Sequence, residues 1–298
     1  MRVLVTGLGG FVGSWCAGQF EVVDLADGQG WVDLRDEARV RAAVAAIGPE
    51  AVLHLAGQSS VAVSLASPRE TYDINFGGTH NLLHALSGAG FRGRMLYVGS
   101  ADVYGAVAAD QLPITETCGV KPLNPYAVSK VAAEALCWQW SQGGDFEIVV
   151  ARPFNHIGPR QSTQFAVADF ARQVAACRAG RAPARLVVGN IDITRDFTDV
   201  RDIVRAYRAL LQSGRNGEVY NVCSGVERSM RDIIGALCAQ CGVQMDIEVD
   251  GERLRPTEQQ RMRGTFAKLQ ADTGWAPAIP FEQTLRDIVD YWDAKDGT

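Results

Sequence analysis

The side chains best suited to chemistry in this sequence are a tyrosine and a lysine four positions apart. Tyr126 and Lys130 belong to the segment NPYAVSK, residues 124–130, in which Asn124 can cap a helix and Pro125 suits its first turn. A helix that begins at Tyr126 would place the phenol and the ammonium on one face. The ammonium would then lower the pKa of the phenol from its ordinary value of about 10. The pattern predicts that Tyr126 serves as an acid or base near neutral pH.

Ser100 is the third candidate, in the segment YVGSADVYG at residues 97–105. It follows a predicted central strand over 94–99, and ligands bind at the carboxyl ends of such strands in parallel sheets. A hydroxyl there can hold a substrate carbonyl or hydroxyl oxygen while Tyr126 transfers the proton. A nicotinamide would supply the hydride for such a reaction. The combination predicts a nicotinamide-dependent oxidoreductase.

A glycine-rich turn, TGLGGFVG at residues 6–13, follows the first predicted strand and opens a predicted helix. Its glycines let the backbone approach a pyrophosphate, and the helix N-terminus adds unpaired N–H groups and a partial positive charge. Only eleven positions lead from Gly13 to Asp24, whereas the ribose-binding acid usually lies about 20 residues beyond the motif, so this helix must be short. Asp24 can bond ribose hydroxyls and favour NAD, but the loop 26–31 has no basic residue to indicate a 2′-phosphate. The choice between NADH and NADPH stays open.

The elements that must position these residues alternate between short apolar strands and amphipathic helices. In the first half, strands are predicted over 2–6, 21–25, 51–55, 94–99 and 147–152. This alternation predicts a parallel sheet covered on both faces, because parallel strands need crossover connections that carry helices. The expected fold class is α/β, a doubly wound Rossmann sheet with a smaller α/β substrate-binding lobe.

The pattern changes after Pro153. Helices are then predicted over 165–179, 202–211, 230–241 and 281–292, with strands over 186–188 and 218–222. We expect a dinucleotide-binding Rossmann domain from residues 1–154 and 191–222. Residues 155–190 and 223–298 would form the lobe that binds the substrate.

Composition narrows the class of protein. The 298 residues are 47% hydrophobic, enough for a substantial core, and the formal net charge of -5 comes without a lysine or arginine run. Nucleic acid and an anionic membrane are therefore not expected partners. The chain begins directly with a strand pattern and contains no run of roughly 20 apolar residues, so a cytoplasmic protein is expected.

The seven cysteines are scattered, which fits reduced thiols better than a disulfide framework. Cys238 and Cys241 form a lone C-x-x-C within a helical pattern, without the second pair or the histidines that zinc would need. His80, Asn81 and His84 also lack metal-ligand partners at suitable spacing and are expected to be packing or surface residues. No metal site is predicted.

Together these motifs resemble the extended short-chain dehydrogenase/reductase family, also called the NAD-dependent epimerase/dehydratase family. The resemblance covers essentially the whole chain and includes the glycine-rich turn, Asp33-Leu34, HLAG at 54–57, NFGGT at 75–79 and Y-x-x-x-K. It implies that the chain binds NADPH or NADH. The residues it assigns to the cofactor are Gly7, Gly10, Phe11, Val12, Asp33, Leu34, Leu55, Ala56, Gly57, Asn75, Tyr126 and Lys130.

The resemblance also implies roles for these residues. Asp33 would bond the adenine, and the loop 55–57 would pass the pyrophosphate. Lys130 would hold the nicotinamide ribose as well as assist Tyr126. Asn75 would support the geometry of the active site.

Within that family, three strings most resemble the reductases of GDP-4-keto-6-deoxy-D-mannose, which make GDP-D-rhamnose. They are VARPFNHIGPR at 150–160, RDFTDVR at 195–201 and NVCSG at 221–225. The likeness implies a GDP-linked deoxyhexose as substrate and reduction of its C4 ketone by NAD(P)H.

The same likeness assigns substrate-binding residues. Asn155 would contact the sugar or its phosphates, and Glu258 would bind the guanine or ribose edge. Arg195 and Arg255 would pair with the pyrophosphate, which guanidinium groups bind well. Each arginine could instead form a solvated surface ion pair.

Asp102 bears on the type of reaction. Related 4,6-dehydratases carry a catalytic acid at this place, usually a glutamate after a threonine and one further residue, whereas this chain has Ser100-Ala101-Asp102. The shorter aspartate serves water elimination less well, which favours a reductase with Asp102 among its candidate catalytic residues. A 4-epimerase or a 4,6-dehydratase, each retaining its NAD(P), remains an alternative. A non-enzymatic cofactor-sensing protein is another, but such proteins usually lack the tyrosine or the lysine.

Two predicted helices, over 72–90 and 126–142, have broad apolar faces. In the family such helices commonly build a four-helix dimer interface, so a homodimer is expected. Trp138 and Trp140 would belong either to that interface or to the core.

Overall fold

The computed structural model describes residues 1–251 and 259–296. Its main element is a six-stranded sheet with parallel pairings in the order β11-β7-β6-β5-β1-β2. These strands are β1 (Arg2–Thr6), β2 (Glu21–Asp24), β5 (Ala51–His54), β6 (Arg94–Val98), β7 (Glu147–Pro153) and β11 (Val219–Val222). The strand order reverses direction between β1 and β5, and ligands of such sheets bind beyond the carboxyl ends of the strands at that point.

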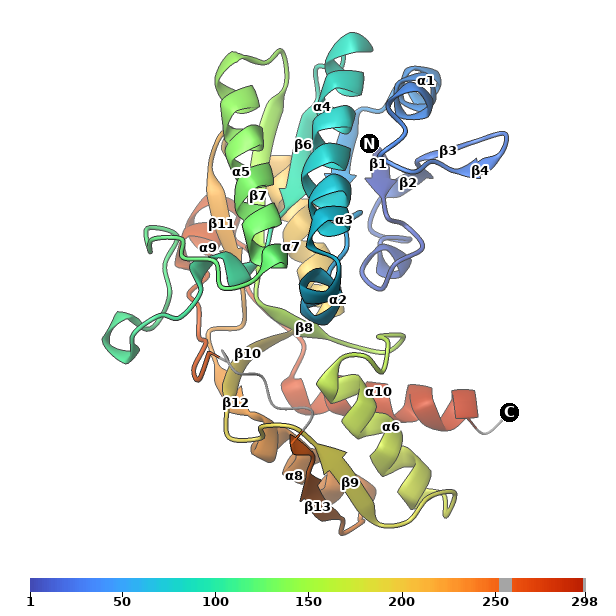
Figure 1. Cartoon of the computed structure of the whole chain (residues 1–298), viewed down its shortest axis with the longest axis vertical. Helices are drawn as coiled ribbons and strands as arrows, with labels where there is room; N and C mark the ends of the chain where they lie inside the picture. Colours follow the sequence, from blue (N-terminus) through green and yellow to red (C-terminus); the bar gives the residue numbers. More distant parts are fainter. Residues whose placement is uncertain (252–258, 297–298) are drawn as a thin grey trace.

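Helices cover both faces of this sheet (Figure 1). Strand side chains alternate between two apolar clusters: Leu4 packs in one, and its neighbours Val3 and Val5 pack in the other. The first cluster includes side chains of α1 (Glu37–Ile47), α4 (Gly78–Gly88) and α5 (Pro125–Gly143). The second includes side chains of α7 (Val200–Ser213) and α9 (Ala267–Thr273). The predicted doubly wound α/β sheet is confirmed.

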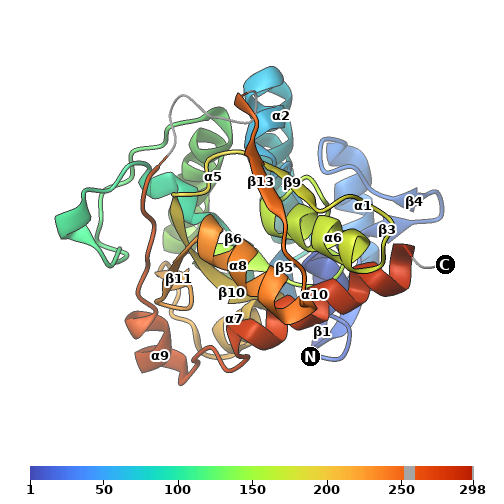
Figure 2. The same ribbon diagram turned by 90° about the horizontal axis from the view of Figure 1, so that it is seen from below.

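A second group of elements follows the carboxyl ends of β7 and β11, in the lower half of Figure 1 and in front of the sheet in Figure 2. Its helices are α6 (Ala166–Arg178), α8 (Met230–Cys241) and α10 (Phe281–Asp296). They share an apolar cluster with β9 (Arg185–Val188), which pairs with β13 (Asp246–Val249). This group therefore has a core of its own.

A three-stranded sheet accompanies that group, in the order β12-β10-β8. Its strands are β8 (Asn155–Ile157), β10 (Thr194–Asp199) and β12 (Glu227–Ser229). The segment 191–222 therefore serves both parts of the molecule: β10 lies in the small sheet, whereas α7 and β11 belong to the main sheet and its covering layer.

The short elements lie mainly in loops near strand ends. The helices among them are α2 (Val61–Ala66), α3 (Pro68–Tyr72), the π-helix η2 (Asp73–Gly77), and the 3-10 helices η3 (Ala101–Tyr104) and η4 (Ala109–Gln111). A small hairpin joins β3 (Ala26–Asp27) to β4 (Gly30–Trp31), in a segment that was predicted to be a loop.

The helix predicted after the glycine-rich turn does not form. The structure has only one 3-10 turn there, η1 (Gly13–Trp15), and the chain reaches β2 at Glu21. Gly18 has φ 90°, a conformation that ends helical geometry. The turn ends at Trp15. The guanidinium of Arg160 is 4.8 Å from the centroid of the Trp15 ring, and that of Arg201 is 5.8 Å from it. The turn thus lacks the dipole of a full α-helix.

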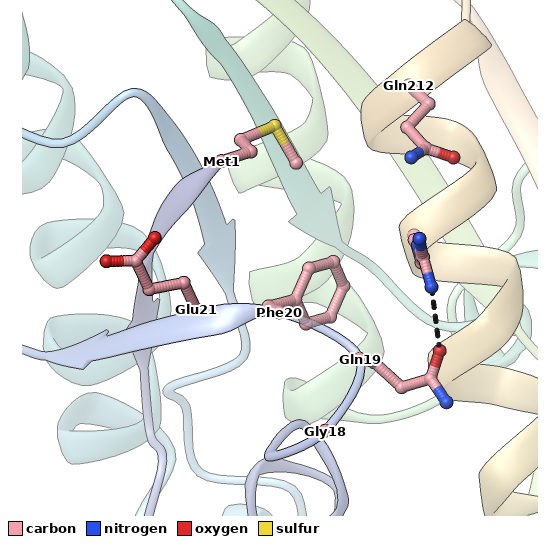
Figure 3. Close-up of a pocket in the computed structure, with 7 residues that line it drawn as sticks. Met1, Gly18, Gln19, Phe20, Glu21 and Gln212 are labelled. Carbon is pink, nitrogen blue, oxygen red and sulfur yellow. Dashed lines mark hydrogen bonds between the residues drawn. The ribbon is translucent and has the colours of Figure 1, made fainter.

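A surface pocket lies beside this shortened segment (Figure 3). It is lined by Met1, Gly18, Gln19, Phe20, Glu21, Arg208 and Gln212. Since Met1 and Glu21 stand at the amino ends of β1 and β2, the pocket is at the edge of the sheet opposite to the expected ligand site.

Within residues 1–251 and 259–296, no helix combines the length and apolar character needed to cross a membrane.

Candidate active site

Tyr126 and Ser100 meet where β6 ends and α5 begins. The α5 helix starts as predicted: Pro125 is in its first turn, and the Asn124 side chain accepts a hydrogen bond from the Ala127 N–H at 2.8 Å. Tyr126 is therefore fixed at the helix start, with 8% of its surface exposed. The Ser100 hydroxyl accepts from the Asp102 N–H at 3.2 Å and is also hydrogen-bonded to the Tyr126 phenol. The structure thus brings together the proposed proton donor and the hydroxyl expected to hold substrate.

Lys130 lies one turn further along α5. Its Nζ donates to the carbonyl oxygen of Val98 at 2.9 Å and is 5.9 Å from the Tyr126 ring centroid. Burial lowers the pKa of Lys130 from 10.5 to about 8, against the opposing charge of Glu134. The ammonium is thus held at the end of β6, on the same side as Tyr126.

The prediction that Lys130 lowers the pKa of the Tyr126 phenol is wrong in this structure. The pKa of Tyr126 lies above its ordinary value of 10, first because of burial and then because of the negative charge of Asp102. The hydrogen bond from Ser100 opposes this, whereas Lys130 is engaged with the Val98 carbonyl. The phenol is consequently protonated at neutral pH, the state needed to donate a proton to an oxygen.

Asn75 ties the loop after β5 to α5. It lies in η2, and π-helical turns occur frequently at functional sites. Its amide donates to Ser129 Oγ at 2.9 Å and to the Gln58 carbonyl at 3.0 Å. Ser129 in turn donates to the Tyr126 carbonyl at 2.6 Å. A Cβ at Gly57 would lie 2.9 Å from Asn75 Oδ1, so a side chain there would displace the Asn75 amide.

The glycine-rich turn and the loop after β5 lie against each other at the switch point of the sheet. Gly7 has φ 77°, and an added Cβ there would lie 2.9 Å from the Ala56 nitrogen. The Ala56 N–H donates to Thr6 Oγ1 at 3.2 Å, and that hydroxyl pairs with His54 Nδ1 at 2.7 Å. Gly10 closes the turn by donating to the Gly7 carbonyl at 3.0 Å. This close backbone packing fits the cradle that a dinucleotide pyrophosphate needs.

The remaining predicted cofactor residues extend from this turn in two directions. Phe11, next to Val12, stacks on His156 with ring centroids 6.0 Å apart, which joins the turn to the segment after β7. Asp33 is held by Arg35, whose side-chain hydrogen bonds lower the pKa of the carboxyl, and the carbonyl of Leu34 accepts from Asn81 at 2.9 Å. Asp33 and Leu34 are thus anchored near the start of α4.

The predicted substrate residues are only partly described. Asn155 begins β8 and is exposed, and Arg195 lies on the adjacent strand β10, where Phe197 is the register partner of Asn155. Arg195 Nη1 donates to the Thr194 carbonyl at 2.8 Å. Arg255 and Glu258 lie outside the described residues, as the range 252–258 is not described.

No group of three or more His, Cys, Asp or Glu side chains that could hold a metal ion occurs in the part of the chain that the structure describes. Cys238 and Cys241 are free thiols on α8. His80 and His84 pack together with ring centroids 4.3 Å apart, and His84 also meets Trp140.

Glu134 and Arg152 were missed by sequence reasoning. Both are buried, with 7% and 8% of their surfaces exposed, and they form an ion pair at 2.7 Å between α5 and β7. Spacing could have indicated Glu134, since it is four residues after Lys130 and must share its helical face.

Comparison with known proteins agrees with this geometry. The family model described as GDP-mannose 4,6 dehydratase matches residues 30–288. The GDP-6-deoxy-D-mannose reductase of Pseudomonas aeruginosa is 44% identical, with coverage of 99% of this chain and 98% of that protein. A solved structure of RMD from Pseudomonas aeruginosa complexed with NADPH superposes with a TM-score of 0.92, at 44% identity and 99% coverage of both chains.

A more distant match is the structure of Thermus thermophilus UDP-glucose 4-epimerase complexed with NAD. It has a TM-score of 0.86 and 30% identity, and the match covers 98% of this chain and 99% of the epimerase. The relatives therefore include both reductases and epimerases on one scaffold. The chain belongs to the GDP-mannose 4,6 dehydratase family, within the extended short-chain dehydrogenase/reductases.

Proposed function

We propose that this chain reduces the C4 ketone of GDP-4-keto-6-deoxy-D-mannose with NADPH or NADH to give GDP-D-rhamnose. The observation that carries the proposal is the buried, protonated Tyr126 phenol hydrogen-bonded to Ser100 at the carboxyl edge of the sheet. The 44% identity to a GDP-6-deoxy-D-mannose reductase over nearly the whole chain supports the same reaction.

The cofactor would lie across the switch point. Gly7, Gly10 and the loop 55–57 would hold its pyrophosphate, with Phe11 and Val12 alongside. Asp33 and Leu34 would face the adenine, and Lys130 would hold the nicotinamide ribose with support from Asn75. When bound, the reduced nicotinamide supplies the hydride.

The protein groups handle the oxygen and its proton. Ser100 Oγ would hold the substrate ketone oxygen, and the Tyr126 phenol would deliver the proton to that oxygen as it gains negative charge. Lys130, whose ammonium is 5.9 Å from the Tyr126 ring centroid, would hold the nicotinamide ribose beside these two groups. Nothing in this sequence of steps needs a metal ion.

The nucleotide sugar would bind between the two parts of the molecule. In this proposal, residues 1–154 and 191–222 bind the cofactor, and residues 155–190 and 223–298 bind the GDP-sugar. Asn155 and Arg195, on neighbouring strands of the small sheet, would contact the sugar and its phosphates. Arg255 and Glu258 complete the proposed set.

A 4,6-dehydratase is the strongest alternative, and one observation favours it. Asp102 acts on the Tyr126 phenol through its charge, so a second acid lies near the site. It has one methylene less than the glutamate of the dehydratases, however, and reaches less far toward the sugar. This shorter reach favours the reductase.

We also propose a homodimer formed through the helical segments 72–90 and 126–142, which comprise the end of α3, η2, α4 and most of α5. Apolar side chains are exposed on these elements, among them Tyr72, Phe76, Val128 and Trp138, whose exposed fraction is 58%. Trp140 differs, because it packs on Phe146 in the core. A cytoplasmic location is part of the proposal, since all seven cysteines are free thiols.

The test incubates purified protein with the product of GDP-mannose 4,6-dehydration and either NADPH or NADH, and follows cofactor absorbance and product NMR. Consumption of added cofactor in step with GDP-D-rhamnose formation supports the reductase. A rearranged sugar with unchanged absorbance, from protein purified with stoichiometric bound NAD(P), would contradict it and indicate an epimerase. The rates with the two cofactors give the preference that Asp24 leaves open.

A further inference from the structure

Glu134 lies directly behind the catalytic lysine. It follows Lys130 by one turn of α5, and both side chains are buried, with 7% and 6% of their surfaces exposed. Residues four apart on a helix share a face, so the carboxylate and the ammonium point to the same buried side. A carboxylate in such a position is costly to bury unless it is paired.

The pairing comes from Arg152 on β7. Its Nε donates to both Glu134 carboxylate oxygens, at 3.2 and 3.0 Å, and its Nη2 donates to Oε2 at 2.7 Å. The guanidinium also lies 4.8 Å from the Tyr104 ring centroid, and the Tyr104 hydroxyl donates to Asn221 Oδ1 at 2.7 Å. Arg152 therefore has a fixed orientation, and so has the carboxylate it holds.

Gly99 connects this pair to the reactive edge of β6. A side chain at Gly99 would collide with Glu134 Oε1, so the carboxylate packs against the bare backbone at that point. On one side of Gly99, the Val98 carbonyl accepts a hydrogen bond from Lys130 Nζ at 2.9 Å. On the other side is Ser100. The ion pair thus lies against the three-residue segment that holds both Lys130 and the proposed substrate-binding hydroxyl.

Stability alone gives no reason for an ion pair at this position. Removing two charges from water costs about as much as their attraction returns, and well-packed apolar residues often serve as well. We propose that Glu134, oriented by Arg152, is a positioning residue that keeps the amine of Lys130 charged and aimed at the end of β6. The proposal rests on the proposed function for its catalytic consequence, but the charge of Lys130 can be measured without any substrate.

The groups that face Lys130 identify Glu134 as its anionic partner. They are Tyr126, Glu134 and Cys137 on α5, Tyr97 on β6 and His54 on β5. Burial lowers the pKa of His54 to about 3 and raises the pKa values of Tyr97, Tyr126 and Cys137, so these four are neutral near pH 8. Burial raises the pKa of Glu134, and the hydrogen bonds and charge of Arg152 oppose that rise. As the carboxylate partner of Arg152, Glu134 opposes the desolvation that lowers the pKa of Lys130 to about 8.

The chain offers a direct measurement because it has only four lysines: Lys121, Lys130, Lys268 and Lys295. NMR of full-length protein labelled with carbon-13 at lysine Cε would give four signals, and Lys130→Arg would assign the one of interest. Two variants are compared with the native chain. Glu134→Gln removes the carboxylate charge in nearly the same shape, and the double variant Glu134→Gln with Arg152→Gln removes both charges, so that no buried cation is left unpaired.

We expect Lys130 to titrate about one pH unit lower in Glu134→Gln than in the native chain, because a nearby opposite charge in a buried site typically shifts a pKa by that much or more. The shift should be smaller in the double variant, because the repelling charge of Arg152 is removed as well. Thermal unfolding reports folding separately, and the double variant should be the more stable of the two. In the reductase assay, the alkaline loss of kcat/KM should move to lower pH in parallel.

A folded Glu134→Gln variant in which Lys130 titrates at its native pH would overturn the proposal and leave the pair a purely structural role. Because this titration needs neither substrate nor cofactor, a failure of the proposed reductase activity would not alter it. The two hypotheses are thereby tested separately.

Discussion

The helices α5 and α7 cover opposite faces of one sheet, yet they bury different kinds of side chain. α7 buries an apolar stripe that includes Val204, Tyr207 and Leu210. α5 also buries apolar side chains, among them Ala133 and Cys137, but it adds a run of polar groups: Tyr126, Ser129, Lys130 and Glu134. Burying polar groups costs free energy unless each finds a partner, so the polar face of α5 is explained by chemistry and the apolar face of α7 by stability.

Two buried tyrosines make this contrast concrete. The hydroxyl of Tyr207 on α7 has no hydrogen-bond partner among the described residues, whereas that of Tyr126 is bonded to Ser100. Tyr207 lies in the apolar core, and Tyr126 lies at the carboxyl edge of the strands. The same side chain is therefore a filler in one place and a candidate acid in the other.

The largest expected effect is loss of activity in Tyr126→Phe. Without the phenolic proton, kcat for ketone reduction should fall by about 10²- to 10⁴-fold, the usual contribution of general acid catalysis. Tyr207→Phe is the matched control and should keep kcat within a factor of two or so, because its hydroxyl makes no bond to lose. Equal losses in the two variants would remove the distinction between the helices.

Ser100→Ala should have the next largest effect. It removes the hydroxyl that bonds the phenol and that would hold the ketone oxygen, so kcat should fall by about 10²-fold. Cofactor affinity, measured by fluorescence titration, should stay near the native value because Ser100 is not among the proposed cofactor residues. Weakened cofactor binding with unchanged kcat would place Ser100 in a different role.

Leu210→Ala should affect stability alone. Leu210 is fully buried in the apolar cluster beneath α7, so the substitution should lower the free energy of unfolding by about 2–5 kcal/mol. Gln212→Ala on the exposed side of the same helix should change it by less than about 0.5 kcal/mol. Denaturant unfolding measures both. A tenfold fall in kcat for folded Leu210→Ala would mean that α7 contributes to catalysis.

The smallest effect is the pH dependence of the native enzyme. The pKa of Lys130 is lowered to about 8, so its charge is present below that pH and is lost as the pH rises through it. The pKa of Tyr126 is raised, so its proton is retained over the same range. Log kcat/KM for reduction should therefore be level toward neutral pH and decline above about pH 8. A rate that rises through pH 8 would indicate that the phenolate is the active form.

Most of the fold could be predicted from the sequence because strand and helix periodicities are local signals. Cys241 ends α8 as predicted, and β9 extends the predicted strand at 186–188 by one residue. The helix expected after Gly13 is wrong, since a single 3-10 turn forms there. Trp15 in that turn contacts Arg160 and Arg201, which are distant in the sequence, so its surroundings could not be predicted from local periodicity.

Some features of the candidate site could likewise be predicted from the sequence, and others could not. The start of α5 followed from Asn124 and Pro125, which act locally. The pKa of Tyr126 did not, because it depends on burial and on Asp102, neither of which spacing along α5 reveals. Arg152 reaches Glu134 from another element, and that contact exists only once β7 and α5 have packed together.

The central claim is that added reduced cofactor delivers hydride to C4 while Tyr126 protonates the oxygen. The most direct measurement uses NADPH carrying deuterium at the transferable position of its nicotinamide, with GDP-4-keto-6-deoxy-D-mannose as substrate. We expect one deuterium at C4 of the GDP-D-rhamnose product for each cofactor oxidised. With Tyr126→Phe, the labelled product should form only at the residual rate of that variant. Turnover that leaves no deuterium at C4 would contradict the reductase assignment.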